Sequence, residues 1–161
     1  MAVVVSDTSP LRALSHLGHL DWLELLFGQI LVPPAVAHEL QFPPMRFLSM
    51  DLRQMPFLMI VTPQDVVRVA ELRMSLDLGE AEALALAEEV QAELVLIDES
   101  AGRAAVTRAG FRIMGTLGIL LRAKSNGWCD ALKPQLDRLQ KELRFFIAPE
   151  LRSALLSKAG E

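Results

Sequence analysis

Three consecutive valines, Val3 to Val5, stand near the start of the chain and are followed at once by polar residues. A run of β-branched residues is typical of a strand that is buried on both faces, as at the centre of a parallel sheet. The run stops at Asp7, after which Thr8 and Ser9 offer capping hydroxyls and Pro10 suits the first turn of a helix. Ligands of open α/β sheets bind at the carboxyl ends of strands, so Asp7 is a candidate site residue. Its alternative role is to cap the following helix.

The rest of the chain alternates short apolar segments with longer amphipathic ones. We expect strands at 29–32, 57–61, 94–97 and 112–114, and helices at 11–17, 20–27, 34–40, 64–74, 80–90, 101–109, 117–124, 130–143 and 149–157. Strands that alternate with helices in this way favour a parallel sheet covered on both sides. The sequence predicts one domain over residues 1–161, an α/β/α sandwich of three layers with a mostly parallel sheet of four to five strands.

Composition narrows the class of protein. Hydrophobic residues make up 52% of the chain, yet the longest stretch without a charged residue or histidine, residues 25–37, is interrupted by Pro33 and Pro34. It is also shorter than the roughly 20 residues of a membrane-spanning helix. The single cysteine, Cys129, excludes an intrachain disulfide and a zinc site with several cysteines. We expect a soluble cytoplasmic protein that does not associate with membranes.

The charges are unevenly distributed along the sequence. Residues 1–100 contain five Lys or Arg against fifteen Asp or Glu, whereas residues 101–161 contain eleven against five. An acidic centre with a basic flank suits a protein that binds a metal ion and a polyanion. Ordinary variation among solvated helix charges is the alternative.

Three carboxylates are expected to converge at one edge of the sheet. The helix that starts at Glu80 rises about 16 Å, and the strand at 94–97 returns about 13 Å, which brings Asp98 back to the level of Glu80. If this strand pairs in parallel with the valine strand, Asp7 and Asp98 lie at the same edge. Carboxylates held this close repel one another unless a cation is present, and oxygen ligands suit Mg²⁺ or Mn²⁺.

Each of these acids also has a structural interpretation. Glu80 opens a helix, where a negative charge is favoured by the helix dipole, and Asp98 could cap the helix that follows it. Glu39 is harder to explain in this way, because it lies near the end of its helix. The spacing of residues does not by itself bring Glu39 to the other acids.

Four motifs in order resemble those of the PIN domain, a metal-dependent ribonuclease fold, and of a prokaryotic branch related to toxin–antitoxin ribonucleases. They are Ser-Asp-Thr-Ser-Pro-Leu at 6–11, Val-Pro-Pro-Ala-Val-Ala-His-Glu-Leu at 32–40, Leu-Gly-Glu-Ala-Glu-Ala-Leu at 78–84 and Leu-Ile-Asp-Glu at 96–99, with Phe-Ile-Ala-Pro-Glu-Leu at 146–151 as a further match. The resemblance spans nearly the whole chain.

The resemblance implies four catalytic and metal-binding acids, namely Asp7, Glu39, Glu80 and Asp98, around Mg²⁺ or Mn²⁺. Family members usually carry Asp in the third place, and Glu80 is one methylene longer. Glu82 lies on another face of the helix and ranks behind Glu80. Three further residues are expected to support the ligands or a metal-bound water, namely Thr8, Ser9 and Glu99.

The implied function is endoribonuclease activity, with the toxin of a toxin–antitoxin pair as the candidate biological role. The partners would be an RNA substrate and an antitoxin protein. Basic residues of the second half are candidates for binding RNA phosphates, namely Arg103, Arg108, Arg112, Arg122 and Lys124. Because aromatic residues are few and tyrosine is absent, we expect recognition to depend on backbone shape more than on base stacking. The apolar, Met-rich segment 41–60 favours a homodimer.

Two other functions fit the same sequence. One is a catalytically weak or inactive module that binds nucleic acid or protein, which the Glu at position 80 favours. The other is a phosphohydrolase that acts on small molecules.

Overall fold

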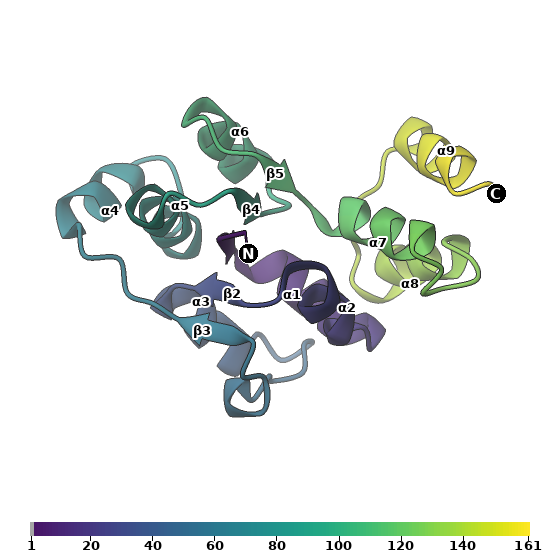
Figure 1. The fold of residues 1–161 in the computed structure, drawn as a ribbon, viewed down its shortest axis with the longest axis horizontal. Helices are drawn as coiled ribbons and strands as arrows, with labels where there is room; N and C mark the ends of the chain where they lie inside the picture. Colours follow the sequence, from purple (N-terminus) through teal and green to yellow (C-terminus); the bar gives the residue numbers. More distant parts are fainter. Residues whose placement is uncertain (1) are drawn as a thin grey trace.

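The computed structural model describes residues 2–161 and shows short strands alternating with helices (Figure 1). The strands are β1 (Val4–Ser6), β2 (Ile30–Val32), β3 (Leu58–Ile60), β4 (Leu94–Leu96) and β5 (Ile113–Met114). The helices are α1 (Thr8–Leu17), α2 (Leu20–Phe27), α3 (Pro34–Gln41), α4 (Val66–Leu72), α5 (Leu78–Val90), α6 (Ser100–Arg108), α7 (Thr116–Ser125), α8 (Lys133–Glu142) and α9 (Pro149–Lys158), with a 3₁₀ turn, η1 (Leu52–Gln54).

The strands form one parallel sheet in the order β3-β2-β1-β4-β5. The valine strand β1 lies at its centre, as the sequence predicts, and pairs with β2 on one side and β4 on the other. Val5 is opposite Val95, and the backbone N–H of Asp7 donates to the carbonyl of Leu96 at 2.9 Å. From β1 the chain continues to β2 and β3 on one side of the sheet, and it later adds β4 and β5 on the other side. The carboxyl end of β1 is therefore the switch point at which open α/β sheets form a crevice.

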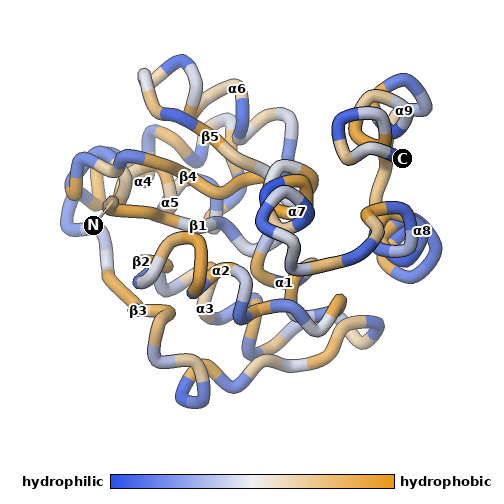
Figure 2. The backbone as a smooth tube through the Cα atoms, turned by 45° about the vertical axis from the view of Figure 1, so that its right-hand side comes forward, coloured by the Kyte–Doolittle hydropathy of each residue, from blue (hydrophilic) through white to orange (hydrophobic). Residues whose placement is uncertain are grey.

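Helices cover both faces of the sheet, which confirms the three-layer α/β/α prediction. Successive side chains of a strand point to opposite faces. Val4 and Leu96 accordingly belong to one buried cluster, with α1, α2, α7 and α8, whereas Val5 and Val95 belong to the other, with α4, α5 and α6. Figure 2 shows the sheet as a predominantly hydrophobic centre and α8 as a largely hydrophilic outer helix.

Two proline pairs delimit α3, the helix that carries Glu39. Pro33 and Pro34 lie at its start, where the missing N–H costs nothing and the fixed φ suits the first turn. Pro43 and Pro44 follow its end, and the chain then runs as an irregular loop to η1. This loop brings Arg46 and Phe47 beside α1, a position that matters for the cleft described below.

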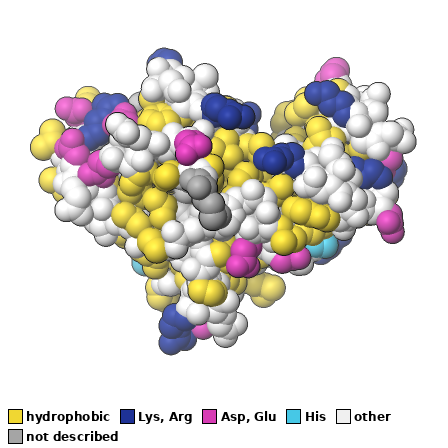
Figure 3. Space-filling view, in the orientation of Figure 1, with side chains coloured by type: hydrophobic (Ala, Val, Ile, Leu, Met, Phe, Trp, Pro, Cys, Tyr) yellow, Lys and Arg dark blue, Asp and Glu magenta, His cyan; other side chains and the backbone are white. Residues whose placement is uncertain are grey.

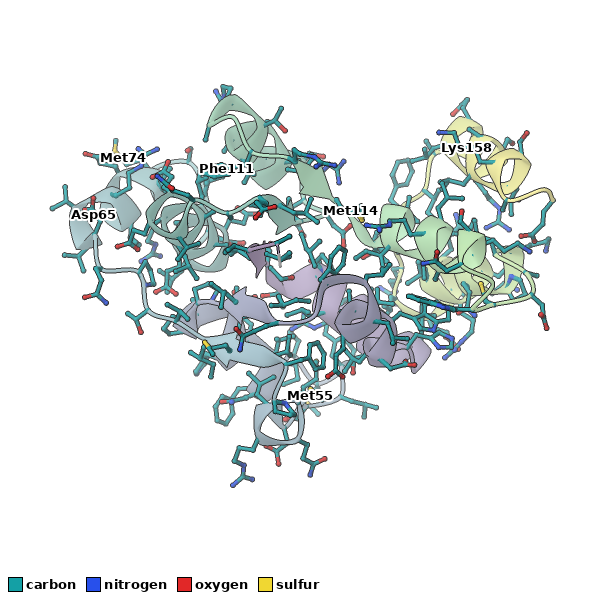
Figure 4. All side chains as sticks on the ribbon, in the orientation of Figure 1. Met55, Asp65, Met74, Phe111, Met114 and Lys158 are labelled. Atoms are coloured by element: carbon teal, nitrogen blue, oxygen red, sulfur yellow. The ribbon has the colours of Figure 1, made fainter. Side chains whose placement is uncertain are left out.

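The C-terminal helix α9 lies far from α4, on the other side of the molecule (Figure 4). Figure 4 labels Asp65 and Met74, which flank α4, on the opposite side of the molecule from Lys158 of α9. Met114 lies between these extremes, at the end of β5 where the sheet meets α7. Within residues 2–161, none of the helices combines the length and apolar composition of a membrane span.

Candidate functional site

Asp7 occupies the carboxyl end of β1 and is almost completely buried, with 4% of its surface exposed. It is the residue before α1, but its side chain makes no capping hydrogen bond to that helix. A buried carboxylate at the switch point of the sheet, free of this structural role, is the natural starting point for a functional site.

Three carboxylates surround Gly79 in the first turn of α5. A Cβ atom on Gly79 would lie 3.0 Å from Glu39 Oε1, 3.4 Å from Asp7 Oδ1 and 3.6 Å from Asp77 Oδ1. One point therefore has three carboxylate oxygens within 3.6 Å, contributed by the residue after β1, by α3 and by the residue before α5. We call Asp7, Glu39 and Asp77 the acidic cluster. Glycine at position 79 is what leaves space between them.

Glu39 is held in the acidic cluster by contacts with α1. The hydroxyl of Thr8 donates to Glu39 Oε2 at 2.5 Å, and Arg12 donates to the Glu39 backbone carbonyl at 3.1 Å. Because Thr8 occupies Oε2, the other oxygen, Oε1, is the one that faces Gly79. The packing of α1 against α3 thus brings Glu39 to Asp7, a juxtaposition that residue spacing alone does not predict.

Glu80 is buried beside the acidic cluster but takes part in a capping box. Its backbone N–H donates to Asp77 Oδ1 at 2.8 Å, and its Oε2 accepts from the Asp77 N–H at 3.1 Å. Sequence reasoning did not select Asp77 as a site residue. The signal was present, since Asp77 and Glu80 have the spacing of a capping box, which places both acids at one helix N-terminus.

Asp98 lies at the same sheet edge but turns its carboxylate toward α7. Its Oδ1 accepts from the Thr116 N–H at 2.7 Å and its Oδ2 from the Thr116 hydroxyl at 2.6 Å. A Cβ on Gly115 would be only 2.6 Å from Asp98 Oδ1, so the carboxylate packs directly on backbone. Of the four predicted ligands, Asp7 and Glu39 are thus in the cluster, Glu80 borders it, and Asp98 caps a neighbouring helix.

The predicted supporting residues lie in different surroundings. Thr8 binds Glu39, as described above. Ser9 and Glu99 line a cavity next to Asp98, and Glu99 is exposed at the start of α6. Glu82 accepts a hydrogen bond from the Ala35 N–H at 2.8 Å and so fixes the start of α3.

Burial and mutual repulsion make the site a poor environment for negative charge. The pKa of Asp7 is raised to about 7, mainly by burial and to a lesser extent by the charges of Asp77, Glu80 and Glu39, while the Thr8 N–H opposes the rise. Burial is also the main cause that raises the pKa of Glu80 and of Asp98. At neutral pH the Asp7 carboxyl is therefore partly protonated in the absence of a cation.

The donor atoms of the acidic cluster are of the kind that binds a divalent cation, but their positions do not form a metal site. Carboxylate oxygens are the donors that Mg²⁺ and Mn²⁺ prefer. However, no group of three or more His, Cys, Asp or Glu side chains in residues 2–161 is spaced to hold a metal ion directly. The donor set fits a hard divalent ion, and binding one requires the side chains to draw closer.

The predicted RNA-binding residues are scattered over the surface. Arg103 donates to the Ile97 carbonyl at 3.0 Å, Arg122 lies over the ring of Phe27, and Lys124 contacts the Asp130 carbonyl. Arg108 and Arg112 are exposed. Two cavities adjoin Asp98, one of about 510 Å³ and one of about 580 Å³. Of the five predicted RNA-binding residues, only Arg103 lines one of these cavities.

Replacing Asp7 tests the electrostatic description. In metal-free buffer the folded protein binds the Asp7 proton more tightly than the unfolded chain, so the wild-type free energy of unfolding should fall as pH rises from about 4 to about 7. Asp7→Asn should be as stable as wild type near pH 4 and more stable above pH 7, by about 1 to 4 kcal/mol. Urea unfolding in EDTA at several pH values measures this. Asp21→Asn, at an exposed position, is the control, and parallel curves for wild type and Asp7→Asn would contradict the description.

Comparison with known proteins identifies the family. No curated protein sequence shows significant similarity to the chain. A family model described as PIN domain matches residues 3–161, which is nearly the whole chain. PIN domains are generally nucleases and typically use divalent metal ions. The match agrees with the four acidic motifs and with the parallel three-layer fold, and on this evidence the chain belongs to the PIN-domain family.

Proposed function

We propose that this protein is a metal-dependent endoribonuclease that hydrolyses phosphodiester bonds of RNA with Mg²⁺ or Mn²⁺. The observation that carries the proposal is the convergence of Asp7, Glu39 and Asp77 on Gly79. Burying the Asp7 carboxylate next to those of Glu39 and Asp77 costs stability, and a bound cation would offset that cost. Membership of a family whose members are generally nucleases supports the same conclusion.

In this proposal Asp7 and Glu39 are the central metal ligands, and Glu80 and Asp98 complete the set. Glu80 Oε2 and both oxygens of Asp98 accept hydrogen bonds at helix N-termini. Direct ligation by either residue would exchange such a hydrogen bond for a bond to the ion. Asp77 is an additional candidate because its Oδ1 faces the same point as Asp7 and Glu39.

A divalent ion bound here would supply an activated water and stabilise the charge that develops on the phosphate. The chain's own residues prepare for this. Thr8 orients Glu39 through the hydrogen bond to Oε2, and the burial of Asp7 removes competing water. Gly79 leaves the space between the carboxylates open.

The alternative is a PIN-like module that binds nucleic acid or protein without cleaving it. The helix-capping contacts of Glu80 and Asp98 favour this alternative, because both acids have a structural function without any metal. A small-molecule phosphohydrolase is the third candidate and would cleave simple phosphate esters. The assays below separate the three.

The biological role that we propose is the toxin of a toxin–antitoxin pair, with an antitoxin protein as partner. Expression of the chain in bacteria, followed by a growth measurement, tests this role. The wild-type chain should arrest growth, whereas Asp7→Asn should not. Arrest by both chains would argue against RNA cleavage as the cause.

Cleavage of RNA should depend on Asp7. Asp7→Asn should lower Mn²⁺-dependent cleavage of a labelled RNA by roughly 100-fold or more, since a metal ligand is lost, while Asp21→Asn keeps full activity. Gel analysis of the RNA measures the rates, and a generic phosphate ester serves as the second substrate. Equal cleavage by wild type and Asp7→Asn would point to a contaminating nuclease and contradict the assignment.

Gly79→Ala should separate stability from function. Alanine is the better helix former, but its Cβ would stand within 3.6 Å of three carboxylate oxygens. We expect unchanged or higher thermal stability in EDTA together with at least tenfold weaker stabilisation by Mn²⁺ and slower cleavage. The control is Gly118→Ala in α7, where the new Cβ meets the flexible side chain of Met114. Normal metal binding by Gly79→Ala would show that the acidic cluster is not the metal-binding site.

A homodimer through the segment 41–60 remains a prediction. Phe42, Met45 and Leu48 expose 69%, 104% and 86% of their surface, which is unfavourable for a monomer. Leu48→Lys should shift the protein to a lower mass by light scattering, whereas Met74→Lys, at an exposed position beside α4, should not. A monomer at all concentrations would refute the dimer.

A further inference from the structure

A cleft of about 510 Å³ opens beside α1 and Asp98. It is formed by α1, the loop after α3, the start of α6 and residues 143–146, and it includes Asp98 and Glu99. Its size is that of an ordinary small-ligand site. Three arginines and three phenylalanines also line it, namely Arg12, Arg46, Arg144, Phe47, Phe145 and Phe146. We call this region the arginine cleft.

Two guanidinium groups in the arginine cleft share one aromatic ring. Arg12 lies 4.4 Å and Arg46 4.7 Å from the centroid of the Phe47 ring. No salt bridge within residues 2–161 involves Arg12, Arg46 or Arg144. Two cations in one cleft that form no salt bridge with the described residues favour the binding of an anion there.

The position of Arg12 connects this basic group to the acidic cluster. Arg12 donates to the Glu39 carbonyl at 3.1 Å. Burial lowers the pKa of its guanidinium, the charge of Arg46 adds to this effect, and the charges of Glu39 and Asp7 oppose it. An anion bound by Arg12 and Arg46 would therefore lie next to the carboxylates. A chain of phosphates could extend from one group to the other.

Phe146 adds a surface for a nucleobase. It exposes 85% of its surface and lines both the arginine cleft and the second cavity of about 580 Å³. The second cavity lies between β5, the start of α7 and α9, where Figure 3 shows a notch flanked by hydrophobic and basic side chains. A large aromatic side chain exposed between two hollows can stack an unpaired base.

We propose that the arginine cleft binds single-stranded nucleic acid, with Arg12, Arg46 and Arg144 contacting phosphates and Phe146 stacking a base. This inference rests on the proposed nuclease function for the location of the scissile phosphate at the carboxylates. Base faces are hidden within a duplex, so stacking on Phe146 selects an unpaired segment. The interface thus differs from the sequence-based expectation, which favoured cations of the second half and little stacking.

The test is a binding measurement in EDTA with a fluorescent single-stranded oligouridine, followed by anisotropy over a range of salt. Arg46→Ala and Arg144→Ala should each weaken binding several-fold and reduce the slope of log affinity against log salt by about 0.7. Phe146→Ala should weaken binding about tenfold with an unchanged slope. The controls are Arg108→Ala and Leu25→Ala, which alter exposed side chains outside both cavities and outside segment 41–60. Circular dichroism checks that all variants fold.

Three results would overturn the proposal. They are wild-type affinity in all cleft variants, an equal loss in the controls, and displacement of the oligonucleotide by polyglutamate at equal charge. Tighter binding of a duplex would likewise refute the base-stacking role of Phe146. Because the measurement needs no metal, it is independent of cleavage. If the cleft variants lose affinity for the oligonucleotide but the wild type does not cleave RNA in Mn²⁺, the nuclease function alone is refuted. If the wild type cleaves RNA but the cleft variants keep wild-type affinity, the role of the arginine cleft alone is refuted.

Discussion

The repulsion among carboxylates at the carboxyl end of β1 is the constraint on which the site depends. Asp7 is buried, and Glu39 and Asp77 point at the same space beside Gly79. Such an arrangement costs free energy, so the surrounding structure must enforce it. The central, doubly covered strand fixes Asp7, Thr8 fixes Glu39, and the helix cap fixes Asp77. The fold thereby holds three carboxyl groups close together at the carboxyl end of β1.

Two of the acids serve helices while they border the site. Glu80 completes the capping box of α5, and Asp98 binds the N-terminus of α7 through Thr116. Capping by a carboxylate stabilises a helix and orients the side chain without a metal. A structural role of Glu80 and Asp98 at helix N-termini is therefore compatible with a position at the edge of the site.

The distribution of charge in space differs from that along the chain. The basic second half suggested a polyanion surface on its own helices, yet Arg122 packs over Phe27 and Lys124 contacts Asp130. The arginine cleft instead combines Arg12 and Arg46 from the acidic half with Arg144 from the basic half. The charge asymmetry along the sequence therefore does not predict which cations share a cleft.

The sequence by itself determined the fold class, the central strand and the identity of the acids at the sheet edge, because strand periodicity, helix signals and parallel pairing are local or nearly local properties. It left open whether Glu39 reaches Asp7, and it did not reveal Asp77 or the arginine cleft. Those depend on how α1 packs on α3 and how the 43–50 loop and residues 143–146 meet. Contacts between segments so far apart arise only from tertiary packing, which no short spacing in the chain encodes.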